Sequence, residues 1–315
     1  MKSERNKTID ISVQEGKEYL ERCLTAADSS RFDRKDIIIN GDTFEVLPKL
    51  PQKSVDLLVV DPPYNLDKKF GGMKFKKTDS DSYAYYTRHW IEAVLPLLKP
   101  NASVYVCCDW QSSMVIGNLL SEYFIVRNRI TWQREKGRGA SANWKNGMED
   151  VWFATVGKDY TFNLDAVKVR KKVVAPYKEN GKPKDWEETD EGNYRNTCPS
   201  NFWDDISIPY WSMPENTTHP TQKPEKLIAK LILASSNEGD TVLDIFAGSG
   251  TTPVTAKKLG RRYIGIELDE QYCVFAQKRL EMAEQDPSIQ GYTDGVFWER
   301  NTFSAQRNKR KPTLK

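Results

Sequence analysis

The stretch VLDIFAGSGTT, residues 242–252, is typical of a buried strand that ends in a glycine turn and continues as a helix. Gly248 and Gly250 fall in the turn, where the lack of a side chain lets backbone N–H groups face a ligand closely. The next predicted strand ends at Glu267, 19 residues after Gly248. This spacing suits a carboxylate that binds the two ribose hydroxyls of a nucleoside. The segment therefore predicts a nucleoside-binding α/β unit.

Two residues near the turn indicate which cofactor this unit binds. A dinucleotide favours a small residue where Pro253 stands and a free helix N-terminus for its pyrophosphate. Asp244, just before the turn, instead offers a carboxylate to an ammonium group. S-adenosylmethionine carries an ammonium group and a nicotinamide dinucleotide does not, so the sequence favours S-adenosylmethionine. A strand-to-helix turn without a ligand is the alternative.

The rest of the chain supplies further strands and helices. Short β-rich runs alternate with helical stretches between residues 36 and 156, and the alternation returns after residue 223. Strands interleaved with helices predict a parallel sheet. Between about 157 and 218 polar, glycine, proline and aromatic residues dominate, which indicates a loop-rich insertion. We also expect one helix within 14–27 and a flexible basic tail beyond about 301.

Composition excludes several classes of protein. The 315 residues are 38% hydrophobic and 11% aromatic, enough for a substantial core. No apolar run approaches the roughly 20 residues of a membrane span, and the N-terminal residues lack the apolar segment of a secretory signal. We therefore expect a cytoplasmic protein. Five cysteines without a CxxC pair and two histidines predict neither a disulfide framework nor a metal site.

A second stretch, SVDLLVVDPPYNLDKKFGG (54–72), is an apolar run that meets Asp61, Pro62, Pro63 and Tyr64. In an open α/β sheet ligands bind beyond the carboxyl ends of strands, where these residues fall. An amino group is a hydrogen-bond donor, so the Asp61 carboxylate and the Pro62 carbonyl can each accept one of its N–H groups. The prolines stiffen the loop and add no competing N–H. Tyr64 offers a flat ring on which a base can stack.

These groups suit the methylation of an amine. The amino group of adenine is a poor nucleophile because its lone pair is delocalised into the ring. Two acceptors that draw its protons out of the plane would localise the pair and direct it at the methyl group of a sulfonium. Asp-Pro-Pro-Tyr alone is also typical of a capped turn, so the prediction depends on both motifs occurring in one chain.

The motifs DPPY (61–64), HPTQKP (219–224) and FAGSGTT (246–252) resemble those of the β group of DNA amino-methyltransferases, which accompany type II restriction systems or act alone. The resemblance covers roughly residues 36–285. It implies a permuted doubly wound, mostly parallel α/β sheet of seven strands, the Rossmann-like methyltransferase fold. It also implies S-adenosylmethionine as cofactor and duplex DNA as partner. Members with Asp at the position of Asp61 mostly methylate adenine N6.

Residue roles follow from the same resemblance. Asp61, Pro62, Pro63 and Tyr64 would form the catalytic motif that holds the flipped base. Within the cofactor site, Asp42 would accept from the adenine amine, with Phe44 beside it, Glu267 would bind the ribose, and Thr221 and Lys223 would lie near the carboxylate. The full implied cofactor set is Asp42, Phe44, Asp61, Thr221, Lys223, Asp244, Phe246, Gly248, Ser249, Gly250, Thr251, Thr252 and Glu267.

His219 is expected to make local hydrogen bonds, because methylation of an amine requires no histidine base.

The predicted organisation is an N-terminal helical extension (1–35), a catalytic half (36–156), a target-recognition insert (157–218), a cofactor-binding half (219–300) and a basic tail (301–315). A cognate restriction endonuclease is a further implied partner, the chain is expected to be nucleoid-associated, and it would act as a monomer or a homodimer. Cytosine N4 methylation is the first alternative. A non-catalytic adenosine-cofactor-binding module and a dinucleotide oxidoreductase are further alternatives, which Pro253 and the intact catalytic motif oppose.

The net charge of +3 is small, so the distribution of charge matters more than its sum. Basic residues gather after the catalytic motif and within the insert, where we expect phosphate contacts by Lys68, Lys69, Lys74, Lys76, Lys77, Lys168, Arg170, Lys171, Lys172, Lys182 and Lys184. Arg195 and Asn193 are candidates for reading bases. A solvated loop is the alternative for the run in the insert.

Overall fold

The structure is a computed structural model that describes residues 3–65, 68–70, 73–75, 78–134, 141–174, 177–180, 182–189, 192–300 and 302. For residues 68–70, 73–75 and 183 it describes the backbone only. Lys76, Lys77 and, apart from Thr302, the predicted basic tail (301–315) lie outside the described residues.

A nine-stranded sheet forms the body of the molecule, and β8 runs antiparallel to both of its neighbours while the other neighbouring pairs are parallel. Seven strands of four or more residues lie between two-residue strands at the edges, which confirms the mostly parallel sheet. In spatial order the strands are β1 (Leu24–Thr25), β2 (Ile37–Asn40), β16 (Arg262–Glu267), β15 (Thr241–Asp244), β3 (Val55–Val60), β6 (Leu98–Cys108), β8 (Met148–Thr155), β7 (Ile125–Gln133) and β14 (Phe202–Trp203).

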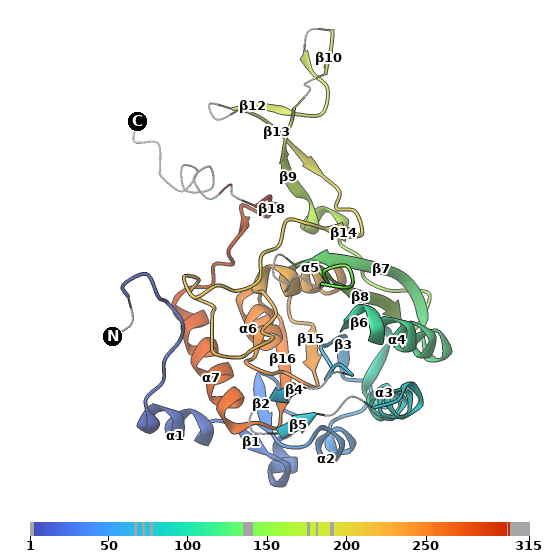
Figure 1. Cartoon of the computed structure of the whole chain (residues 1–315), viewed down its shortest axis with the longest axis vertical. Helices are drawn as coiled ribbons and strands as arrows, with labels where there is room; N and C mark the ends of the chain where they lie inside the picture. The colour runs from blue at the N-terminus through green and yellow to red at the C-terminus, as the bar shows by residue number, and fades with distance from the viewer. Residues whose placement is uncertain are drawn as a thin grey trace.

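Helices cover both faces of this sheet (Figure 1). One layer contains α1 (Val13–Glu21), α5 (Glu225–Ser235), α6 (Thr251–Lys258) and α7 (Glu270–Gln285), and the other contains α2 (Thr43–Val46), α3 (Ser80–Val94) and α4 (Trp110–Tyr123). Strand β3 shows why both layers are needed. Leu57 and Val59 pack into the core under α5, whereas Leu58 and Val60 pack into the core under α3 and α4. Because successive side chains of a strand point to opposite faces, a continuous apolar run requires cover on both sides.

In the part of the chain that the structure describes, four 3₁₀ helices connect these elements: η1 (Ala26–Arg31), η2 (Leu47–Lys49), η3 (Leu95–Leu97) and η4 (Leu164–Val167). A hairpin of β4 (Lys68–Phe70) and β5 (Met73–Phe75) follows the Asp-Pro-Pro-Tyr segment. Within the described residues no helix is both long and apolar enough to cross a membrane.

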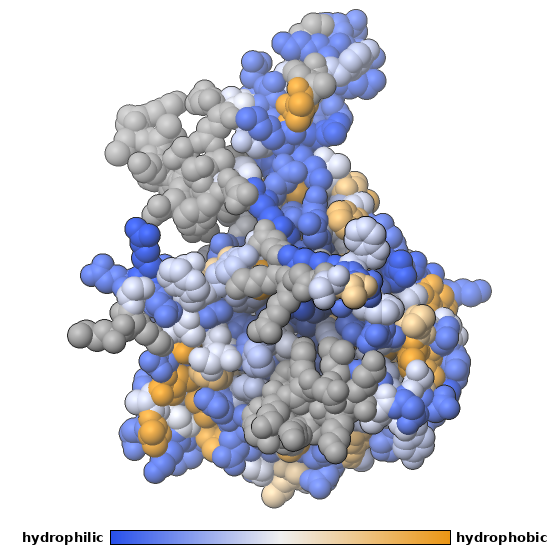
Figure 2. Space-filling model, in the orientation of Figure 1, coloured by the Kyte–Doolittle hydropathy of each residue, from blue (hydrophilic) through white to orange (hydrophobic). Residues whose placement is uncertain are grey.

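The segment 157–218 is more regular than the sequence predicts. It contains η4, the edge strand β14 and the short strands β9 (Val169–Lys172), β10 (Lys178–Glu179), β11 (Lys182–Pro183), β12 (Glu187–Thr189) and β13 (Gly192–Thr197). The strands β12, β13 and β9 form a second sheet with β18 (Val296–Trp298) and β17 (Tyr292–Thr293). These strands carry no long apolar run, so hydrophobic periodicity does not predict them. Figure 1 shows β9, β10, β12 and β13 standing out from the body, and Figure 2 shows that this projection is mostly hydrophilic.

Candidate functional site

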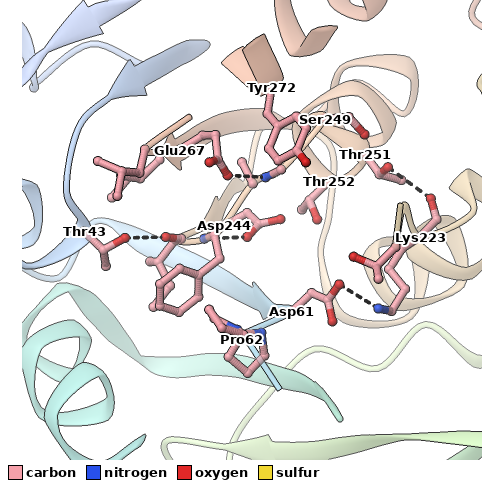
Figure 3. A pocket seen from close by; sticks show the side chains of 18 of the residues that line it. Thr43, Asp61, Pro62, Lys223, Asp244, Ser249, Thr251, Thr252, Glu267 and Tyr272 are labelled. Atoms are coloured by element: carbon pink, nitrogen blue, oxygen red, sulfur yellow. Dashed lines mark hydrogen bonds and ion pairs between the residues drawn. The ribbon is translucent and has the colours of Figure 1, made fainter. Parts of the chain in front are cut away.

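A cavity of about 340 Å³ lies at the carboxyl ends of β2, β3, β15 and β16 (Figure 3). Every predicted catalytic or cofactor residue except Gly250 lies on its wall: Asp42, Phe44, Asp61, Pro62, Pro63, Tyr64, Thr221, Lys223, Asp244, Phe246, Gly248, Ser249, Thr251, Thr252 and Glu267. The motifs at residues 61–64 and 246–252, which are far apart in the sequence, thus meet in one cavity.

The glycine turn has the backbone geometry that its sequence predicts. Gly248 and Gly250 have φ of +51° and +79°, a region that residues with a Cβ rarely adopt. A Cβ on Gly250 would lie 2.5 Å from the Cβ of Ala276, so this glycine allows α6 and α7 to pack closely. Gly250 therefore supports the cavity from behind, whereas Gly248 lies on the wall.

Glu267 is held at the end of β16 by two backbone N–H groups. Gly248 donates to its Oε2 at 2.7 Å and Asp269 donates to its Oε1 at 2.8 Å. Burial raises the pKa of Glu267, and the two backbone hydrogen bonds oppose that rise. Each carboxylate oxygen has a further lone pair, so the fixed side chain can still accept from a ligand.

Asp244 is a buried carboxyl group at the end of β15. It is 4% exposed and accepts from the Phe246 N–H at 3.0 Å. Burial raises its pKa to about 7, and hydrogen bonds from Thr252 and Phe246 oppose the rise. Among the described residues no lysine or arginine forms an ion pair with it. An entering cation would therefore find a carboxylate without a competing positive partner.

Asp42 and Phe44 form the wall on the β2 side. Asp42 caps α2 by accepting from the Phe44 N–H at 2.8 Å. The Phe44 ring stacks on His89 with 4.5 Å between centroids, and Thr43 donates to the Ile245 carbonyl at 2.6 Å. These contacts fix an aromatic surface beside the glycine turn.

Asp61, Tyr64 and Lys223 form a cluster on another part of the cavity wall. Lys223 Nζ lies 2.6 Å from Asp61 Oδ2 and 3.1 Å from the Tyr64 hydroxyl oxygen. The Tyr64 hydroxyl lies 2.9 Å from Asp61 Oδ1. The ammonium of Lys223 thus lies against the Asp61 carboxylate, and the expectation that Lys223 lies near the carboxylate of the cofactor stays a prediction.

Burial and the neighbouring carboxylates decide the protonation states of Lys223 and Tyr64. Burial alone would lower the pKa of Lys223, but Asp61 and Glu149 raise it above its ordinary value. Burial raises the pKa of the Tyr64 hydroxyl, and the nearby carboxylates of Asp61 and Glu149 raise it further. A charged ammonium therefore lies beside a neutral phenol.

His219 makes the local contacts expected of it. Its Nδ1 accepts from the Thr221 N–H at 3.3 Å, and its ring meets the Tyr272 ring edge to face at 4.3 Å between centroids. Burial lowers the pKa of His219 to about 4, so the ring is neutral near pH 7.

Sequence reasoning missed Glu149, Thr43, Tyr86 and Tyr272. Glu149 is 5% exposed at the start of β8, and its Oε2 lies 3.4 Å from Lys223 Nζ. In a fully parallel sheet an acid at the start of a strand would lie at the edge opposite the cavity. The place of Glu149 in the sequence therefore does not predict that it lies near the cavity. Because β8 runs antiparallel, its first residues lie beside the carboxyl ends of β6 and the parallel strands.

The basic residues of the insert differ in their exposure. Arg170 is 4% exposed and lies near the rings of Tyr194 and Trp298, so the prediction that it contacts phosphate is wrong. Its hydrocarbon chain and guanidinium form part of the core of the small sheet. Lys172 is exposed, and Lys171 lies 3.8 Å from Glu299. Arg195 pairs with Asp185 at 2.9 Å.

Comparison with known proteins identifies the family. A family model described as DNA methylase matches residues 55–278. The DNA adenine methyltransferase YhdJ of Escherichia coli (strain K12) is 34% identical over 267 residues, which cover 82% of this chain and 87% of that protein. The type II methyltransferase M.HpaI of Haemophilus parainfluenzae is 33% identical over 253 residues, which cover 78% and 74% of the two chains.

Two solved structures share the fold. The PvuII DNA methyltransferase (cytosine-N4-specific) has a TM-score of 0.58 and 17% identity, over 80% of this chain and 92% of its own. The M1.HpyAVI–SAM complex has a TM-score of 0.51 and 24% identity, over 77% and 98% of the two chains. Since the family model matches more than half of the chain, and two relatives are more than 30% identical over at least three quarters of it, this chain belongs to the N6/N4 family of DNA methylases.

Proposed function

We propose that this DNA methylase transfers a methyl group from S-adenosylmethionine to N6 of an adenine that has left the stack of duplex DNA. One observation carries the proposal: the Asp61–Tyr64 motif and the glycine turn with Glu267 lie on the wall of a single cavity. The catalytic and cofactor roles of the individual residues are part of this proposal.

The residues of the cavity suit S-adenosylmethionine. A volume of about 340 Å³ is within the range of small-molecule sites. Glu267, fixed by two N–H groups, can accept from ribose hydroxyls, and the buried Asp244 can face the ammonium group. Asp42 and Phe44 would meet the adenine, and Thr221, Ser249, Thr251 and Thr252 the methionine portion. When bound, S-adenosylmethionine supplies a methyl group on a sulfonium.

The chain's own residues would hold and orient the base. The Asp61 carboxylate and the Pro62 carbonyl accept the two N–H groups of the amine, while Tyr64 stacks on the ring. Holding the amine in place is worth several kcal/mol of the barrier, about 7–11 for ideal alignment. Extrusion of the base costs a few kcal/mol, which contacts with the flanking DNA must offset.

Adenine is favoured over cytosine as the target. The relative from E. coli, 34% identical to this chain, is named a DNA adenine methyltransferase, and the motif begins with Asp61. Cytosine N4 is the second candidate because a cytosine-N4-specific enzyme shares the fold. Both bases present an exocyclic amine beside a ring nitrogen, so the same acceptors serve either one.

The projecting small sheet is proposed to contact DNA, with β9 to β13 of segment 157–218 as the target-recognition region. Its surface is mostly hydrophilic and carries exposed lysines (Figure 2). We place the enzyme in the cytoplasm with the nucleoid, acting as a monomer or homodimer. A cognate restriction endonuclease is a proposed partner of the same biological system.

Expression in a bacterial strain without DNA amino-methylation tests the proposal. Single-molecule sequencing of the host genome should find N6-methyladenine at one recurring sequence, and it should find none in cells that express Asp61→Ala. Genomic DNA without modified adenine in the wild-type culture, despite expression of folded protein, would refute the proposed target.

A further inference from the structure

Both oxygens of the Asp61 carboxylate already have donors. Lys223 Nζ lies 2.6 Å from Oδ2, and the Tyr64 hydroxyl donates to Oδ1 at 2.9 Å. Under the proposed function, Asp61 has to accept an N–H group of the target base. Each oxygen keeps a further lone pair, but the ammonium and the hydroxyl already draw on the negative charge of the carboxylate, so both donors weaken Asp61 as an acceptor for the substrate.

Glu149 offers the same two donors a second carboxylate. Its Oε2 lies 3.3 Å from the Tyr64 hydroxyl oxygen and 3.4 Å from Lys223 Nζ. Both distances are long for a hydrogen bond, so Asp61 is the closer partner of both donors in this arrangement. The other oxygen of Glu149 accepts from Arg134. Arg134 thus holds the side chain while Oε2 faces the donors of Asp61.

The second carboxylate also solves a problem of charge. An ammonium that leaves Asp61 inside the protein would be buried without a counter-charge, which is costly. Lys223 is 7% exposed, and water therefore gives it little help. With Glu149 beside it, Lys223 keeps a carboxylate partner in either position. Asp61 and Glu149 thus offer two carboxyl groups to the two basic side chains Lys223 and Arg134 in either arrangement.

We propose that Glu149 is a positioning residue that takes over the Tyr64 hydroxyl and the Lys223 ammonium when the target base enters, and so releases Asp61 for the amine. The inference rests on the proposed function, because it requires an amine to bind at Asp61. The Tyr64 hydroxyl turns its single hydrogen from Asp61 to Glu149, and its ring stays available for stacking. Only hydrogen bonds and ion pairs change in this step.

The substitution Glu149→Gln tests the exchange. It removes the charge with little change of size and leaves Lys223 held by Asp61. We expect single-turnover methyl transfer to duplex DNA to fall about ten- to a hundredfold, the range for loss of a hydrogen bond to a charged group. Calorimetric affinity for S-adenosylhomocysteine should not change. A wild-type transfer rate in Glu149→Gln would overturn the inference, and so would a loss of rate that arises from weaker cofactor binding.

Asp150 provides a matched control on the same strand. It is 6% exposed and accepts from Ser113 and Thr131, away from the cluster. Asp150→Asn should lower the melting temperature without lowering the rate of methyl transfer. If Glu149→Gln fails to fold, Arg134→Gln carries the test, because Arg134 is partly exposed and holds the Glu149 side chain. Without Arg134 the Glu149 carboxylate is no longer held facing the donors of Asp61, so methyl transfer should also slow. A wild-type rate in that variant would then overturn the inference.

A double-mutant cycle distinguishes exchange from a general structural role. Tyr64→Phe removes one of the two donors that compete for Asp61. In the Glu149→Gln background it should restore part of the rate, so the two effects should not multiply. Independent, multiplying decreases would contradict the exchange. A wild-type enzyme that methylates no DNA would refute the proposed function itself, which separates the two failures.

Discussion

The wall of the cavity around the glycine turn and the cluster around Asp61 are built in different ways. The turn and its acid come from one continuous unit, and Glu267, which accepts from Gly248, stands 19 positions after it. The cluster joins Asp61 to Lys223 across 162 residues and Tyr64 to Glu149 across 85. The first region depends on local backbone geometry and the second on the order and direction of strands.

This difference separates binding from transfer. The glycine turn, Asp244 and Glu267 are expected to set the affinity for the cofactor. The cluster of Asp61, Tyr64, Glu149 and Lys223 is expected to set the rate at which a bound base reacts. A variant should therefore act mainly on the property that its own region sets.

The largest expected effect is that of Asp61→Ala. Loss of one preorganised group that stabilises a transition state typically costs about 100- to 1000-fold in rate, and Asp61 is the proposed acceptor for the amine. Methyl transfer in a single-turnover assay should fall by at least about a hundredfold. Calorimetric titration should show that the affinity for S-adenosylhomocysteine largely survives. Near-normal turnover would show that Asp61 is not the acceptor.

The second prediction concerns two glycines with a positive φ, a conformation that would be strained for any residue with a Cβ. Gly248 has φ of +51° and a Cβ there would lie 3.0 Å from His219 Nε2, whereas Gly239 has φ of +82° and open space around it. Gly248→Ala should raise the dissociation constant of S-adenosylhomocysteine about tenfold, since strain of about 1–2 kcal/mol falls on the cavity wall. Gly239→Ala should cost similar stability and leave affinity intact. Equal affinities in both variants would place the cofactor elsewhere.

The third prediction is a pH dependence of cofactor binding. Because burial raises the pKa of Asp244 to about 7, its carboxyl is mostly protonated at pH 6 and mostly ionised at pH 8. An ammonium group requires the ionised form, so affinity for S-adenosylhomocysteine should rise with pH, by about tenfold over this interval. Asp244→Asn should bind weakly at both values. A flat profile in the wild-type protein would mean that Asp244 does not hold the ammonium group.

The smallest expected effect lies outside the cavity, on strand β9. Removal of one phosphate contact should reduce the slope of log affinity against log salt by about 0.9. Lys171→Ala/Lys172→Ala should therefore lower that slope for any duplex DNA. The control Lys17→Ala/Lys53→Ala removes the same charge from exposed positions away from the carboxyl ends of the strands. Identical slopes in both double variants would leave the lysines of β9 as solvated side chains.

The parts of the site that the sequence predicts are those with a local cause. A glycine turn between strand and helix, an acid at the next strand end and Asp-Pro-Pro-Tyr after an apolar run each follow from neighbours in the chain. Glu149 could not be predicted in this way, because its place depends on the reversed direction of β8.

The insert shows the same limit. Its strands are short and polar, and two partners in its sheet, β17 and β18, come from residues 292–298. The burial of Arg170 depends on one of them, since Trp298 of β18 lies beside its guanidinium. A charge run in the sequence therefore does not separate a core arginine from exposed lysines.

Identification of the methylated nucleoside tests the central claim most directly. Purified protein would be incubated with unmethylated plasmid DNA and S-adenosylmethionine that carries an isotopically labelled methyl group, and the digested DNA would be analysed by mass spectrometry. We predict labelled N6-methyladenine as the product of the wild-type protein and no labelled nucleoside from Asp61→Ala. Labelled N4-methylcytosine, or DNA without label from a protein that binds the cofactor, would contradict the account.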